Sequence, residues 1–219
     1  MKKSKAILLA LCAVLLVAAS VMGTLAYLTS SDTVTNTFTV GNVKITLDEK
    51  DVDNSTPGAE RDKANSYKLL PGHEYEKDPV IHVAAGSSDC YLFVKVKNEI
   101  SDIEGNPTVA KQMADNGWVK VFDSNLVYVY ADENGNPKVV STTSTTGADV
   151  DVFKTFTIAD DVNDEETLPV EPGHTDPSRN VRQLSLYNDK QIIVTAYAVQ
   201  ADGFAGKTAA QIWGDAGFS

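Results

Sequence analysis

The sequence has little cysteine, which limits both covalent cross-linking and thiol chemistry. Only Cys12 and Cys90 occur among its 219 residues. Cys12 lies in the middle of an apolar run near the amino terminus, whereas a lipid-bearing cysteine would stand at the end of such a run. The rest of the chain then holds Cys90 alone, so no intramolecular disulfide can form there. We expect Cys90 to be a small buried residue on a strand.

Catalytic and nucleic-acid-binding motifs are lacking as well. The sequence contains no G-x-S-x-G elbow, no P-loop and no G-x-G-x-x-G turn. Its 30 Asp and Glu outnumber 19 Lys and Arg, which gives a net charge of −11. An acidic protein without a basic patch repels nucleic acid and anionic membranes. We therefore expect no nucleic-acid partner.

What the sequence does contain begins with a secretory signal. Lysines at positions 2, 3 and 5 precede an apolar run over residues 6–21, and small residues crowd the end of that run. We expect residues 1–26 to be a signal peptide and residues 27–219 to form a single secreted domain. Only the uncleaved precursor is then expected to contact the membrane.

Signal cleavage is expected after Ala26, with Thr24 two residues before it and Tyr27 as the new amino terminus. Cleavage after Ser20 or Gly23, and retention of the apolar run as a membrane anchor, are alternatives. Loss of the leader lowers Lys+Arg from 19 to 16 against an unchanged 30 Asp+Glu, so the net charge moves from −11 to −14. That charge keeps a secreted protein soluble.

A strand-forming segment follows the expected cleavage site directly. Gly41 interrupts its pattern as a hinge or bulge would, and beyond it Val43, Ile45 and Leu47 share one face of a half-buried strand. We expect residues 27–40 to be a mobile strand that adds to the sheet edge of a neighbour. The expected donor residues are Thr33, Val34, Thr35, Asn36, Thr37, Phe38, Thr39 and Val40.

The remaining sequence predicts an all-β fold. Many short alternating runs are separated by turn signals, among them the Asn-Gly pair at residues 134–135. Helices are expected only at residues 107–115 and 207–213, and a single strand is expected over residues 150–158. We predict an antiparallel β-sandwich of the jelly-roll type, with its strand aromatics packed in the core.

Three histidines are the candidate metal ligands. Two of them lie in Pro-Gly-His turns, which would meet at one end of a sandwich, but the H-E-x-x-H helix of zinc peptidases is absent. A histidine that merely sits in a turn is the simpler interpretation. We expect no cofactor, with a divalent metal as the alternative, held by His73, His82 and His174.

Several segments resemble the TasA and camelysin family of secreted proteins of Gram-positive bacteria. These are GTLAYLTSSDTVTNTFTVGNVKITL at residues 23–47, LLPGHEYEKDPVIHV at 69–83, AGSSDCYLFVKV at 85–96 and VTAYAVQADGF at 194–204. The resemblance implies a jelly-roll-like sandwich and export with cleavage by a SipW-type signal peptidase. In the TasA branch it implies matrix fibres in which an amino-terminal strand completes the next subunit's sheet. In the camelysin branch it implies a cell-surface metallopeptidase.

We therefore expect a secreted structural protein of the cell surface or biofilm matrix. It would assemble into fibres with copies of itself or with related matrix subunits, by donation of its amino-terminal strand. A camelysin-like cell-surface metallopeptidase and a monomeric surface-binding module are the alternatives.

Overall fold

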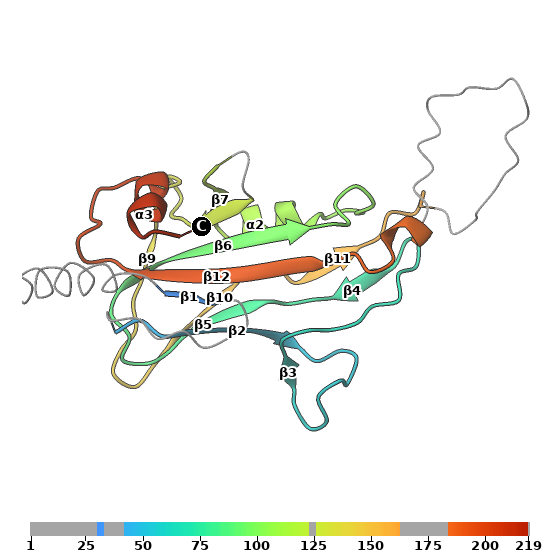
Figure 1. Cartoon of the computed structure of the whole chain (residues 1–219), viewed down its shortest axis with the longest axis horizontal. Coiled ribbons are helices and arrows are strands. Elements are labelled where there is room, and N and C mark those ends of the chain that lie inside the picture. Colours follow the sequence, from blue (N-terminus) through green and yellow to red (C-terminus); the bar gives the residue numbers. More distant parts are fainter. Residues whose placement is uncertain (1–29, 33–41, 123–125, 163–183, 219) are drawn as a thin grey trace, which may run out of the picture.

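Strands make up most of the regular structure of the chain. A computed structural model describes residues 30–32, 42–122, 126–162 and 184–218 (Figure 1). Within these residues the helical elements are two short α-helices and one 3-10 turn, which confirms the predicted all-β class. They are α2 (Val109–Asp115), α3 (Ala209–Asp215) and η1 (Leu184–Tyr187).

The largest sheet is built around two long antiparallel strands. β12 (Ile192–Gln200) pairs along its whole length with β6 (Cys90–Asn98). The described sheet continues on both sides of this pair in the order β1-β12-β6-β8-β7, and β9 pairs with the start of β6. The added strands are β1 (Ser30–Asp32), β7 (Trp118–Lys120), β8 (Val127–Tyr130) and β9 (Val139–Val140).

Two smaller antiparallel sheets complete the described strands. One has the order β10-β5-β2-β3, and the other pairs β11 with β4. The four-stranded sheet contains β2 (Ile45–Lys50), β3 (Arg61–Asp62), β5 (Val80–Val83) and β10 (Ala148–Asp151). The two-stranded sheet contains β4 (Glu74–Glu76) and β11 (Thr155–Thr157).

The main hydrophobic core joins residues of the large sheet to residues of the four-stranded sheet. Leu92 and Val94 of β6 belong to the same buried cluster as Ile45 of β2 and Ile81 of β5. The predicted half-buried strand is confirmed, because Val43, Ile45 and Leu47 alternate with more exposed neighbours. Cys90 also lies in this cluster and is fully buried, as predicted.

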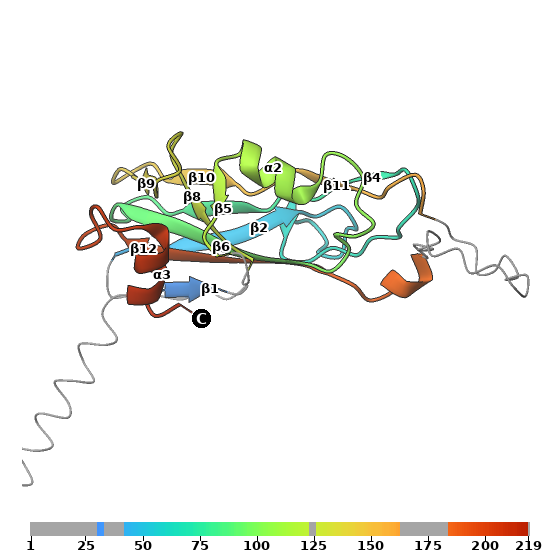
Figure 2. The same ribbon diagram turned by 90° about the horizontal axis from the view of Figure 1, so that it is seen from above.

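A second core covers the other face of the large sheet. Trp213 of α3 packs edge-on against Phe93 of β6 and Tyr197 of β12, with ring centroids 5.5 and 4.9 Å apart. Figure 2 shows α3 lying beside this sheet. Both faces are therefore buried at residues 90–94 of β6 and 195–199 of β12, so the predicted packing of their aromatic residues is confirmed.

Hydroxyl caps set the start of each helix. The Thr108 side chain accepts from the backbone N–H of Lys111, so α2 begins at Val109. Thr208 and Gln211 form a reciprocal capping box, so α3 begins at Ala209 rather than at residue 207.

The strand predicted over residues 150–158 is two strands. β10 pairs with β5, whereas β11 pairs with β4 in another sheet. The partner strands are themselves separated at residues 77–79, where Pro79 has no N–H to donate to a ladder. The break between β10 and β11 therefore lies opposite the break between β4 and β5.

Candidate functional site

The edge of β12 carries a short strand from the amino-terminal part of the same chain. β1 pairs antiparallel with β12, with Ser30 opposite Ala198, Ser31 opposite Tyr197 and Asp32 opposite Ala196 (Figure 1). On its other side β12 pairs with β6 through all nine of its residues. Only three of these nine are paired with β1, so the described part of the chain leaves most of this edge without a strand partner.

β12 is suited to hold a further strand because it lies between the two cores. Ala196 and Ala198 are buried in the cluster between the sheets, and Tyr197 and Val199 are buried in the cluster under α3. A strand that pairs with this edge places alternate side chains beside both clusters. Backbone hydrogen bonds and burial of apolar side chains would thus both stabilise a strand added to β12.

Most of the predicted amino-terminal site lies outside the described residues. This holds for the cleavage residues Thr24, Ala26 and Tyr27, for the hinge Gly41, and for all eight predicted donor residues at 33–40. Ser30–Asp32, within the segment predicted to be mobile, lies in the sheet of its own chain. The described residues contain no helix long and apolar enough to span a bilayer.

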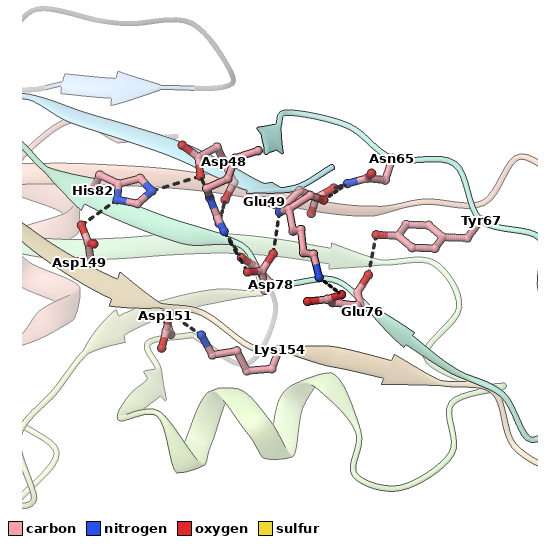
Figure 3. A network of polar contacts seen from close by, with 12 residues as sticks. Asp48, Glu49, Asn65, Tyr67, Glu76, Asp78, His82, Asp149, Asp151 and Lys154 are labelled. Carbon is pink, nitrogen blue, oxygen red and sulfur yellow. Dashed lines mark hydrogen bonds and ion pairs between the residues drawn. The ribbon is translucent and has the colours of Figure 1, made fainter. Parts of the chain in front are cut away.

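His82 lies between two carboxylates on neighbouring strands of the four-stranded sheet. Its Nδ1 is 2.7 Å from Asp149 Oδ1 on β10, and its Nε2 is 3.1 Å from Asp48 Oδ1 on β2 (Figure 3). A carboxylate only accepts, so both bonds need the doubly protonated imidazolium. Burial alone would lower the pKa of His82, but the bonds to Asp149 and Asp48 outweigh burial and raise it.

Arg61 binds the Asp48 carboxylate that His82 also contacts. Its Nε donates to Asp48, and its Nη1 donates to Asp78 Oδ2 at 3.0 Å. These acidic partners raise the pKa of Arg61 although its burial acts in the opposite direction. Burial would raise the pKa of Asp78, but the N–H of Lys50 and the Arg61 guanidinium lower it. The network ties β2, β3, β5 and β10 together.

The stability of this network is expected to depend on pH. The folded pKa of His82 is raised, so its stabilisation is complete below the unfolded value of about 6.5 and is lost as pH rises through the folded pKa. We expect a loss of at most about 1 kcal/mol in the free energy of unfolding, as for other partly exposed ion pairs. Urea unfolding across this pH range measures it.

His82→Gln should remove this component of the pH dependence, and His73→Gln is the matched control that should keep it. An equal change of unfolding free energy with pH in wild type and His82→Gln would show that the His82 bonds do not contribute.

The candidate metal ligands have separate surroundings. His73 packs edge-on against Tyr75, with centroids 4.6 Å apart, whereas His82 contacts Asp149 and Asp48. His174 lies outside the described residues. The described ranges contain no group of three His, Cys, Asp or Glu side chains arranged to hold a metal ion. A site that includes His174 stays a prediction.

Sequence reasoning missed the acidic and basic partners of this sheet because cross-strand register determines them. Asp48 meets His82 one strand away and Arg61 thirteen residues along the chain. Glu49 did leave a signal: it continues the inward series of Val43, Ile45 and Leu47, and it is buried at 5 % exposure. A charged residue at such a position needs partners.

Comparison with known proteins adds no relative. No protein-family model matches the chain, and no curated protein or solved structure matches it. The resemblance to TasA and camelysin proteins therefore rests on the sequence segments alone.

Proposed function

We propose that this protein is a secreted structural subunit of the cell surface or biofilm matrix. Its two facing sheets form a jelly-roll-like sandwich, and its amino-terminal strand adds to β12 of the next copy to build a fibre. Related matrix subunits with the same strand are further partners. A SipW-type signal peptidase releases the strand during export, as the resemblance of the leader to the TasA family implies.

The observation that carries this proposal is the pairing of β1 with β12. Residues next to the expected cleavage site already form an antiparallel ladder with the sheet edge, through three residue pairs. Exchange of this strand for the same strand of another copy keeps those pairs and needs no new contact surface. Such exchange of identical elements is a low-cost route to assembly, and it becomes an open chain when the contact does not close.

The sequence that follows β1 can extend the ladder along β12. Residues 33–40 read TVTNTFTV, in which the apolar Val34, Phe38 and Val40, together with Asn36, alternate with threonines. An extended chain presents these apolar residues on one face and the threonines on the other. In the register of β1, residues 33–36 would continue the ladder opposite residues 195–192, up to the start of β12 at Ile192.

Removal of the amino-terminal strand tests the proposal. Mature protein starting at Tyr27 is expected to form filaments, and protein that lacks residues 27–40 is expected to remain monomeric with an unchanged β-sheet circular dichroism spectrum. Electron microscopy and light scattering measure the difference. A chain with residues 27–40 replaced by an equally long Gly-Ser segment controls for length. Filaments of the truncated protein would refute donor-strand assembly.

A further inference from the structure

A buried carboxylate holds a lysine amine and an asparagine amide together. Glu49, at the inner face of β2, accepts from Lys77 Nζ at 2.5 Å through Oε2 and from Asn65 Nδ2 at 2.9 Å through Oε1. Figure 3 shows Asn65 turned toward Glu49. The Lys77 and Glu49 side chains are only 11 % and 6 % exposed. The amine and the amide thus meet the two oxygens of one carboxylate.

The asparagine amide is fixed in one orientation. Its Oδ1 accepts from the backbone N–H of Val52 at 2.8 Å, and its Nδ2 also donates to the Lys50 carbonyl at 2.8 Å. A backbone N–H that points at a carbonyl oxygen stabilises the negative charge that develops there during nucleophilic attack. The amide carbon is therefore polarised, and its nitrogen donates to a carboxylate oxygen, Glu49 Oε1, that can carry a proton to it.

Aromatic side chains enclose this group on one side. Lys77 Nζ is 6.0 Å from the centroid of the Tyr67 ring, which packs edge-on against Tyr75 and Phe156. Burial, followed by the nearby carboxylates, raises the pKa of Tyr67 well above its usual range. A lysine amine becomes a nucleophile when a base takes its proton, and Glu49 Oε2 is the base within reach of Lys77 Nζ.

We propose that Lys77 and Asn65 react to form an intramolecular isopeptide bond, with Glu49 as the proton carrier. The Lys77 ammonium passes a proton to Glu49, and the free Nζ attacks Cγ of Asn65. The bond from Cγ to Nδ2 breaks as Glu49 delivers the proton to Nδ2. Nζ loses a second proton after the attack, and Glu49 passes this one to the departing ammonia. One N–C bond forms and one breaks, ammonium leaves, and no oxidant or reductant takes part.

An ordinary buried ion pair accounts for less of this geometry. Lys77 and Glu49 form a salt bridge, and burial of the carboxylate calls for a donor on its second oxygen, but that donor need not be an amide whose own carbonyl accepts a backbone N–H. The exposed pair of Lys50 and Glu76, at 2.6 Å, shows the simpler case. The Glu49 group instead presents a nucleophile, an electrophile and a proton carrier together.

The bond would be a covalent cross-link, formed without cysteine, within the long connection between β3 and β5. It joins residue 65 to residue 77 and so closes a short ring that contains β4. A covalent ring stabilises a fold chiefly by restricting the unfolded chain, as a disulfide does. A secreted protein whose expected mature part has a single, buried cysteine has no disulfide for this purpose.

Intact mass measures the bond directly. Folded, secreted wild-type protein is expected to weigh about 17 Da less than its sequence, the mass of one ammonia, and tryptic peptides containing Asn65 and Lys77 should be recovered joined. The Lys77→Arg and Glu49→Gln variants should each have the mass calculated from their own sequence, with no loss of ammonia. Lys50→Arg is the matched control and should keep the loss.

Two results would overturn the proposal, whether or not the variants fold. One is a full mass for folded wild-type protein, with Lys77 cleaved normally by trypsin. The other is a loss of ammonia that maps to another asparagine, such as Asn134 in the Asn-Gly turn, which can cyclise with its own backbone. Neither result depends on fibre formation, so the bond and the proposed function fail separately.

Discussion

Replacement of Trp213 by alanine is expected to lower the free energy of unfolding by about 3–5 kcal/mol, the range for loss of a large core aromatic. Trp213 is 6 % exposed. The centroid of its ring lies 5.5 Å from that of Phe93, 4.9 Å from that of Tyr197 and 5.0 Å from that of Phe218. Its removal leaves a cavity between α3 and the large sheet. Urea unfolding followed by circular dichroism measures the loss.

Leu186 provides the control for this experiment. It is an apolar residue of η1 that is 63 % exposed, so Leu186→Ala should change the free energy of unfolding by less than about 0.5 kcal/mol. If Trp213→Ala costs no more than this control, α3 does not seal the second core. β12 would then have a well-packed core on one face only, and it would be a poorer acceptor for a donated strand.

Several strands of this protein could be predicted from local sequence. The inward series of Val43, Ile45 and Leu47 follows from alternation, β12 from its continuous apolar run, and the burial of Cys90 from the usual burial of free cysteine. The split of residues 150–158 into β10 and β11 could not be predicted in this way. It depends on a break in partner strands far earlier in the chain, at Pro79.

Sites formed by side chains on neighbouring strands could not be predicted from local sequence patterns. His82 was identified as a possible metal ligand, but its partners Asp48 and Asp149 lie 34 and 67 residues away and are set by strand register. The same holds for Glu49 with Lys77, which are 28 residues apart. A buried acidic residue at the end of an inward series is the feature most useful for a search of similar sequences.

Cysteines placed on the two paired strands are expected to report whether β1 stays in its own chain or pairs with another. Ser30 lies opposite Ala198 in the β1–β12 ladder. Directly opposed residues of antiparallel strands have Cβ atoms about 4.5–5.5 Å apart, close to the separation in a disulfide. Burial raises the pKa of the native Cys90 thiol to about 12, with a smaller contribution from Asp89, so this thiol does not compete.

The decisive measurement mixes two mature chains that each carry one new cysteine, Ser30→Cys in one and Ala198→Cys in the other, and oxidises them after assembly. Strand donation predicts disulfide-linked pairs of the two chains on non-reducing gels, and no such pairs when Ser30→Cys is mixed with Leu186→Cys. Filaments that form in the mixture without any disulfide between position 30 of one chain and position 198 of another would contradict assembly through this register of β1 on β12.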